Sequence, residues 1–172
     1  MSDYRYPDPH SESFGAHLFT PGIGEKGYIN IRLEVTSTGG HSSLPPPHTS
    51  IGLLALAIVH IEENPHTPHL TRTSPVYATW LCQAQHAPKI PWRLKSALKL
   101  SVDRDYFLRR AEDLLFRGGD SYLVKTQLRT TQAVDIIQGG VKANALPEQA
   151  EAVINHRVST DRYGLQIQSK YG

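Results

Sequence analysis

Two short segments of the sequence contain polar residues whose types and spacing could support chemistry. The first is TSTGGHSSLPPPHTSI, residues 36–51, in which His41 directly follows a pair of glycines. Glycine lets the backbone turn sharply, and three consecutive prolines make the following loop stiff. An imidazole held there can donate a hydrogen bond into a neighbouring cleft, where it would stabilise negative charge on an oxygen. A loop histidine is more often ordinary polar surface, so this segment alone leaves both interpretations open.

The second segment is GGVKANALPEQAEAVINHR, residues 139–157. Asn144 precedes a turn at Pro147, and Arg157 follows Asn144 by thirteen residues. If two strands pair across that turn, the side chains of Asn144 and Arg157 come near one another. An amide and a guanidinium together suit a small carboxylate, because Arg presents two parallel donors in one plane. An Arg on the polar side of a half-exposed strand is more often solvated, and the residues alone do not decide between the two.

Other motifs do not fit the chemistry that they suggest. GIGEKG, residues 22–27, matches G-x-G-x-x-G, but it opens a strand, whereas a dinucleotide loop follows a strand and opens a helix. His66 and His69 lie three residues apart, but adjacent prolines prevent a shared helical face and no acidic residue completes a metal site. The single cysteine, Cys82, excludes an intrachain disulfide and a cysteine-based zinc site. We therefore predict no metal ligands in this chain.

The elements that position these segments follow from hydrophobic periodicity. Residues 28–35 alternate apolar and polar side chains, as do residues 130–140 and 151–158, which predicts three strands of a sheet covered on one face. A strand, a helix, a strand and a hairpin-like return form the first part of a split βαβ arrangement. The predicted class is α+β, a ferredoxin-like two-layer sandwich with a helical insertion, truncated at the C-terminus because no further helix and strand follow residue 158.

Three helices are predicted as well. Apolar residues at 51, 54, 55, 58 and 61 form one stripe of a helix that either Thr49 or Ser50 caps and that Pro65 ends. Residues 92–100 and 103–116 also have helical patterns, whereas residues 66–91 are dotted with proline and histidine and are expected to be irregular.

Composition limits the classes of function. The chain has 172 residues, 39% hydrophobic and 20% charged, with a net charge of +2. Such a chain can bury a core, and its charge does not fit a nucleic-acid binder. A local excess of eight Lys/Arg over five Asp/Glu across residues 93–125 is typical of a solvated helical face. The longest apolar stretch, residues 51–59, is too short to span a bilayer, and residues 1–14 lack the apolar core of a signal peptide. The compartment is therefore not predicted.

The two segments closely resemble the smaller domain of fungal carboxypeptidase S-like enzymes. These belong to the zinc peptidase family that includes aminoacylase and glutamate carboxypeptidase. The resemblance rests on GGHSS, PPxHTSIG, TTQAxDIIxGG, NALPE and NHR in that order, and it covers residues 25–158. It implies a peptidase dimerisation domain over 25–158 with a helical insert at about 66–128, after an irregular lead-in at 1–24 and before a tail at 159–172.

The same resemblance implies roles for three residues. In the family, a catalytic domain with two zinc ions activates a water, and the small dimerisation or lid domain closes over the substrate; in dimeric members it reaches the partner's active site. His41 matches the histidine that hydrogen-bonds the scissile carbonyl oxygen. Asn144 and Arg157 match the positions that bind the terminal carboxylate of a peptide or N-acyl amino acid. Relatives are often vacuolar or secreted.

The family's metal ligands have no match here, because the H-x-D and D-E-E motifs of the catalytic domain are absent from the sequence. We therefore expect a dimerisation or lid fragment of a zinc-dependent metallocarboxypeptidase, inactive by itself and with no cofactor of its own. The alternative is a non-catalytic dimerisation or regulatory module that pairs with a full-length relative. Both hypotheses allow a homodimer, and neither involves nucleic acid.

Overall fold

The computed structural model describes residues 14–15, 24–118 and 121–160. Its internal contacts divide the chain into two compact units, one made of residues 1–25 and 68–129 and the other of residues 26–67 and 130–172. We call the first the helical unit and the second the sheet unit, and each is described by itself. Both segments with candidate polar residues belong to the sheet unit. The predicted lead-in at 1–24 and tail at 159–172 lie almost entirely outside the described residues.

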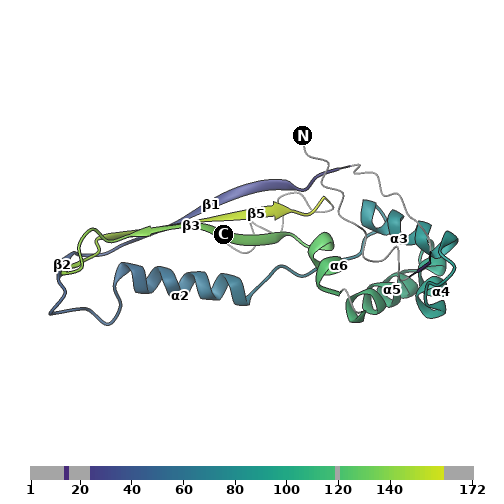
Figure 1. Cartoon of the computed structure of the whole chain (residues 1–172), viewed down its shortest axis with the longest axis horizontal. Coiled ribbons are helices and arrows are strands. Elements are labelled where there is room, and N and C mark those ends of the chain that lie inside the picture. The colour runs from purple at the N-terminus through teal and green to yellow at the C-terminus, as the bar shows by residue number, and fades with distance from the viewer. Residues whose placement is uncertain (1–13, 16–23, 119–120, 161–172) are drawn as a thin grey trace. The chain divides into compact units, whose positions relative to one another are not determined.

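Three long strands form the main sheet of the sheet unit: β1 (Gly27–Thr36), β3 (Thr131–Gly139) and β5 (Gln149–Val158). β5 is central and pairs antiparallel with both neighbours, so the order is β1-β5-β3. β1 and β3 therefore run parallel to each other, and helix α2 (Ser50–Glu63) lies in the connection between them. α2 packs along one face of this sheet (Figure 1). The mixed α+β class that the periodicity predicted is confirmed.

Alternation along β5 decides which face of the sheet is the interior. Its even-numbered residues from 150 to 158 are all buried, whereas the odd-numbered ones are more exposed. On this second face, Asn155 Nδ2 donates to Asn30 Oδ1 at 2.7 Å, and Arg32 forms an ion pair with Glu151. The period of two thus places apolar side chains on one face and polar ones on the other.

A β-bulge interrupts the pairing of β3. Asp135 is the extra residue, and Ile136 and Ile137, which follow it, pair with Val153 and Ala152 of β5. Both isoleucines remain exposed. β3 therefore presents aliphatic side chains at the edge of the sheet.

The start of α2 is fixed by two hydroxyl groups. Thr49 Oγ1 accepts a hydrogen bond from Gly52 N at 3.1 Å, so Thr49 is the cap of the two candidates. The buried hydroxyl of Ser50 instead donates to the carbonyl oxygen of Pro147 at 2.7 Å. This bond ties the helix to the turn before β5, while Leu54 packs into the small core under the sheet.

A second, two-stranded sheet lies at one end of the sheet unit, where β2 (Gly40–His41) pairs with β4 (Ala145–Leu146) (Figure 1). We call residues 39–49 and 140–148 the tip. Gly39 allows a close approach here, because a Cβ at this position would lie 2.6 Å from Oε1 of Glu148.

Four helices make up the described part of the helical unit: α3 (Pro75–His86), α4 (Trp92–Leu100), α5 (Asp105–Arg117) and α6 (Ser121–Leu128). α4 and α5 match the two helices predicted for this region. The helices contribute to one hydrophobic core, whose buried members are Phe14, Leu70, Tyr77, Trp80, Ala84, Ala87, Ile90, Leu94, Ala97, Leu98, Ala111, Leu115, Val124 and Leu128.

The prediction that residues 66–91 are irregular is wrong for α3. Ser74 Oγ accepts a hydrogen bond from Tyr77 N at 3.0 Å, and Pro75 occupies the first helical position. Proline is favourable there because the N–H that it lacks has no partner within a helix. Pro75, which looks like a helix breaker in the sequence, therefore marks the beginning of a helix. α6 likewise has no counterpart among the predicted helices.

Candidate functional site

His41 is the last residue of β2, and it is exposed at the tip. The backbone N–H of Ser43 donates to His41 Nδ1 at 3.2 Å, and the Ser43 hydroxyl oxygen lies 2.8 Å from the same nitrogen. Because a backbone N–H can only donate, Nδ1 is an acceptor, and the neutral ring carries its proton on Nε2. The Nε2–H group is thus the donor that His41 can offer to another molecule.

Asn144 lies on the chain segment that pairs with β2. The backbone N–H of Ser42 donates to the Asn144 carbonyl oxygen at 3.3 Å, and the next residue, Ala145, is the register partner of His41. Asn144 is exposed. The structure therefore places the backbone segments of His41 and Asn144 side by side at the tip, although the two residues are far apart in the sequence.

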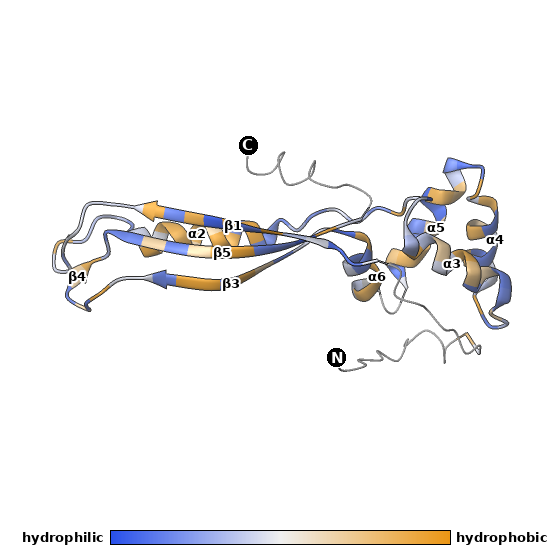
Figure 2. Ribbon diagram, turned by 90° about the horizontal axis from the view of Figure 1, so that it is seen from above, coloured by the Kyte–Doolittle hydropathy of each residue, from blue (hydrophilic) through white to orange (hydrophobic). Residues whose placement is uncertain are grey.

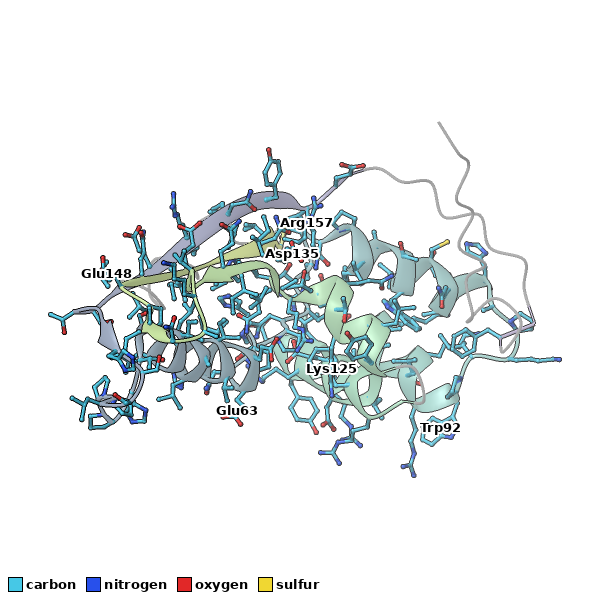
Figure 3. All side chains as sticks on the ribbon, turned by 60° about the vertical axis from the view of Figure 1, so that its left-hand side comes forward. Glu63, Trp92, Lys125, Asp135, Glu148 and Arg157 are labelled. Atoms are coloured by element: carbon cyan, nitrogen blue, oxygen red, sulfur yellow. The ribbon has the colours of Figure 1, made fainter. Side chains whose placement is uncertain are left out.

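Arg157 lies near the opposite end of the main sheet. Its register partners are Tyr28 in β1 and Thr131 in β3, and its guanidinium carbon lies 5.7 Å from the centre of the Tyr28 ring. Figure 3 labels Glu148, which lies next to β4, and Arg157, which lies toward the other end of β5. A strand rises about 3.3 Å per residue, so the eight steps from Gln149 to Arg157 span about 26 Å.

The expectation that Asn144 and Arg157 come near one another is therefore wrong within one chain. The turn at Pro147 does not fold the Asn144 segment back along β5. It lets that segment pair with β2, while β5 continues away from the tip between β1 and β3. Most of the twelve residues between Asn144 and Arg157 belong to one extended strand, β5.

No group of three or more His, Cys, Asp or Glu side chains that could hold a metal ion occurs among the described residues. Two buried histidines of the sheet unit do lie together, with the ring centres of His66 and His156 5.8 Å apart. Two ligands are fewer than the three or four that zinc takes from a protein. The described residues thus do not fit a zinc centre.

Ser43 is the residue of this site that sequence reasoning missed. It stands two positions after His41 in GGHSS, a spacing at which a short polar side chain can reach back to the preceding turn. That local pattern was the available signal. The sequence does not reveal the orientation of the His41 ring. The structure shows it, with Nδ1 facing Ser43 and Nε2 left as the donor.

Comparison with known proteins identifies the family of this chain. The model of the peptidase dimerisation domain of the M20 family matches residues 23–169. The chain belongs to this family. Among the described helices of this dimerisation domain, none is both long and apolar enough to cross a membrane.

Three relatives show which branch of the M20 family the domain resembles. Carboxypeptidase S of Saccharomyces cerevisiae is 36% identical over 164 residues, which cover 89% of this chain and 28% of the relative. An uncharacterized carboxypeptidase of Schizosaccharomyces pombe is 38% identical, with 92% of this chain and 25% of the relative covered. An N-fatty-acyl-amino acid synthase/hydrolase of Bos taurus is 36% identical, covering 79% of this chain and 25% of the relative.

The dimerisation domain is thus a carboxypeptidase S-like member of the M20 family, and the chain spans about a quarter of the length of these curated relatives. The names of the relatives support a hydrolase context. The resemblance read from the two sequence segments is confirmed, including its restriction to the dimerisation domain.

Proposed function

We propose that this chain is the dimerisation and lid part of a zinc-dependent metallocarboxypeptidase that hydrolyses the C-terminal amide bond of peptides or N-acyl amino acids. In this proposal His41 stabilises negative charge on the scissile carbonyl oxygen, and Asn144 and Arg157 bind the substrate's carboxylate. The observation that carries the proposal is the pairing at the tip, where His41, with its proton on Nε2, lies on the strand next to the segment that carries the exposed Asn144. Both are donors suited to an anionic oxygen.

In this proposal, a separate catalytic domain and not this chain would bind the zinc ions. The described residues offer no zinc ligand set, and the chain matches only a fraction of each relative. A zinc ion would supply an activated water, and the residues of this chain would orient the substrate and bind its charged oxygens. His41, Asn144 and Arg157 carry no metal in this scheme.

The distance along β5 has a consequence for how the three residues act. In a C-terminal residue, the carboxylate and the scissile carbonyl group are only about 5 Å apart, because two backbone atoms separate them. His41 and Arg157 of one chain lie at opposite ends of the sheet, about 26 Å or more apart. One bound substrate therefore contacts His41 and Asn144 of one copy and Arg157 of a second copy.

A surface suited to a second copy exists on the sheet unit. α2 exposes four aliphatic side chains, Ile51, Leu53, Leu56 and Val59, and β3 exposes Ile137, whose register partner Ala152 lies on the face that α2 covers. We call these five residues the aliphatic surface. α2 contains no Lys or Arg, and its acidic residues are confined to its last two positions. Figure 2 shows the hydrophobic colouring along α2 and β3. Apolar surface of this kind is favourable to bury against an identical surface, and we propose that the chain forms a homodimer through it.

The remaining fold and domain assignments are part of the same proposal. The strand order β1-β5-β3 with α2 in the first connection corresponds to three of the four strands of a ferredoxin-like sheet. In that fold a further helix and strand would cover the other edge of β1. The domain would extend over residues 25–158, with the helical unit as an insert at about 66–128.

The test uses a graft, because this chain supplies only one part of the proposed enzyme. Residues 25–158 replace the matching segment of S. cerevisiae carboxypeptidase S, and peptide hydrolysis is measured. We expect His41→Ala to lower kcat about 10²–10³-fold with a much smaller effect on KM, as for loss of one oxyanion donor. His41→Gln is the matched control, because its amide can still donate and should recover part of the rate. An unchanged kcat in His41→Ala would remove the role of this residue.

The carboxylate site gives the opposite kinetic pattern in the same graft. Arg157→Ala should raise KM about 10–100-fold, the value of a lost charged hydrogen bond, whereas Arg157→Lys should recover part of the binding because it keeps the charge but not the two-pronged geometry. Asn144→Ala should have a smaller effect of about 2–10-fold. If all three variants change neither KM nor kcat while the graft dimerises, the non-catalytic module becomes the better explanation.

Mixed dimers test the two-copy arrangement directly. When His41→Ala and Arg157→Ala grafts are co-expressed, half of randomly assorted dimers are mixed and each has one intact site, so we expect about one quarter of the activity to return. If His41 and Arg157 of the same chain served one site, every site in the mixture would lack a residue and nothing would return. Absence of recovery in dimers that are shown to be mixed contradicts the arrangement.

A further inference from the structure

The helical unit has a surface that the proposed peptidase role does not use. It follows the exposed side of α4 and the turn after it. Three apolar side chains there are exposed, Trp92 by 72%, Leu100 by 43% and Val102 by 47%. Three cations, Arg93, Lys99 and Arg104, are exposed in the same thirteen-residue stretch. We call these six residues the α4 surface; Figure 3 labels Trp92 on it.

Helix geometry puts the four members that belong to α4, Trp92, Arg93, Lys99 and Leu100, on one side of the helix, and Val102 and Arg104 follow in the turn after it. Trp92, Ser96 and Lys99 follow each other at i, i+4 and i+7, and Arg93 and Leu100 flank that line. The opposite side of the helix, with Leu94 and Leu98 among others, is buried in the core. The apolar residues of the α4 surface are thus left over after the core is complete.

Charge is distributed unevenly between the two units. The helical unit contains twelve Lys/Arg and nine Asp/Glu, a net charge of +3, whereas the sheet unit contains six Lys/Arg and seven Asp/Glu, a net charge of −1. Within the helical unit, residues 68–129 have a net charge of +6. The overall charge of +2 hides this separation. A field of one sign over one unit favours a partner of the opposite sign.

Most of the acidic side chains described in the helical unit are already engaged within it. Asp113 binds Arg110 and Arg117, Asp105 pairs with Arg72, and Glu112 accepts from the backbone N–H of Leu70. Asp103 is the one acidic residue within the stretch of the α4 surface, where it stands among four Lys/Arg. The net positive charge of α4 and its turn is therefore not balanced locally.

We propose that the α4 surface docks on an anionic phospholipid membrane. Indole rings favour the boundary between headgroups and acyl chains, and neighbouring Lys and Arg bind anionic headgroups. Arg93 lies 5.5 Å from the Trp92 ring centre, so a cation and an indole can enter the headgroup layer together. Leu100 and Val102 discriminate against a nucleic acid, because aliphatic side chains neither stack on bases nor bind phosphate, whereas acyl chains accommodate them.

Vesicle pelleting of the full chain tests the proposal. We expect binding to vesicles of phosphatidylcholine with phosphatidylserine, little binding to phosphatidylcholine alone, and loss of binding at high salt, where screening is strong. One cation near an anionic surface contributes about 1 kcal/mol, so Lys99→Gln should weaken partitioning about fivefold and Lys99→Gln with Arg104→Gln about 25-fold. Lys142→Gln is the matched control, an exposed lysine of the sheet unit that should have no effect.

Tryptophan emission gives a second measurement that does not depend on pelleting. The chain has two tryptophans, and Trp80 is only 5% exposed. A blue shift and a loss of acrylamide quenching on adding anionic vesicles should therefore come from Trp92 and disappear in Trp92→Phe, while Trp92→Phe still pellets.

Three outcomes would overturn the proposal. Equal binding to neutral and anionic vesicles, or none to either, removes the role of charge. Equal effects of Lys99→Gln and Lys142→Gln on vesicle binding would exclude the α4 surface as the membrane-binding site. Preferential binding of RNA or polyglutamate, with the same Trp92 shift, would assign the surface to an acidic polymer and not to a membrane.

Discussion

The helical unit and the sheet unit solve the problem of burying apolar side chains differently. Among the described residues, the core cluster of the helical unit has fourteen buried hydrophobic members, whereas that of the sheet unit has three, Leu54, Ala150 and Ala152. Four helices can share one interior, but one helix covers only one side of a three-stranded sheet and leaves its own outer side open. The sheet unit consequently has apolar side chains for which it provides no cover of its own.

The exposed apolar surfaces of the two units differ in the charged residues that lie beside them. The aliphatic surface of α2 and β3 lacks a cation on the helix, so it suits an equally apolar protein surface. The α4 surface places its apolar groups among Arg and Lys, so it suits a partner that is apolar and negatively charged at once. Exposed apolar area alone does not identify a partner; the charge beside it does.

The two cores can be compared with one substitution in each. Leu98 of the helical unit and Leu54 of the sheet unit both have no exposed surface. Leucine to alanine in a core costs about 2–5 kcal/mol, and the cost depends on how far the surroundings collapse. We expect Leu98→Ala to lie near the upper end and Leu54→Ala near the lower end, because the smaller core has fewer rigid neighbours. Hydrogen exchange of amides in each unit measures the two free energies, and a larger cost for Leu54→Ala would contradict the comparison.

The aliphatic surface should govern association of the sheet unit. Leu56→Glu places a charge in the proposed dimer interface twice, once in each copy, and should weaken dimerisation at least about 100-fold, because each buried leucine contributes about 1.5–3 kcal/mol. Sedimentation of the chain measures this shift from dimer to monomer. Leu44→Glu is the matched control, an even more exposed leucine at the tip. Equal effects of both variants would exclude α2 as the interface.

The tip offers a smaller and more local test. In Ser43→Ala the backbone N–H of residue 43 still donates to His41 Nδ1, but the hydroxyl contact at 2.8 Å is lost. Loss of one hydrogen bond of about 0.5–1.5 kcal/mol should lower the fraction of the neutral ring that carries its proton on Nε2. Imidazole nitrogen chemical shifts of the chain measure this fraction, with Ser43→Thr as the control that keeps the hydroxyl. A fraction that does not change would remove Ser43 as a positioning residue.

The smallest effect is expected on the polar face of the main sheet. The Glu151 carboxylate raises the pKa of the Arg32 guanidinium, first through a hydrogen bond and then through its charge. A raised pKa of a cation stabilises the fold at pH values below its ordinary pKa for as long as the partner carboxylate stays ionised, and on the alkaline side the effect is lost only beyond the range in which proteins are usually studied. Because Arg32 is solvent-exposed, Arg32→Gln should leave the melting temperature unchanged within error from neutral to mildly alkaline pH. A clear drop would show that this face is covered.

Much of the secondary structure could be predicted from local pattern. β1, β5, α2, α4 and α5 begin and end within about two residues of the predicted ranges, because alternation and helical stripes are properties of neighbouring residues. α3 was missed because Pro75 looks like a breaker in sequence and acts as a first helical residue once Ser74 caps the helix. The bulge at Asp135 was not visible either, since it exists only relative to β5.

The sequence by itself determined which residues face the interior of the main sheet, which family the chain belongs to, and which three side chains carry its candidate chemistry. Only the tertiary structure decided that His41 stands beside Asn144 and that Arg157 stands at the far end of β5. Spacing along a chain says how many residues separate two groups, but strand pairing decides whether those residues turn back or extend. Here the segment before the turn at Pro147 pairs with β2, whereas the segment after it continues as β5 along the main sheet.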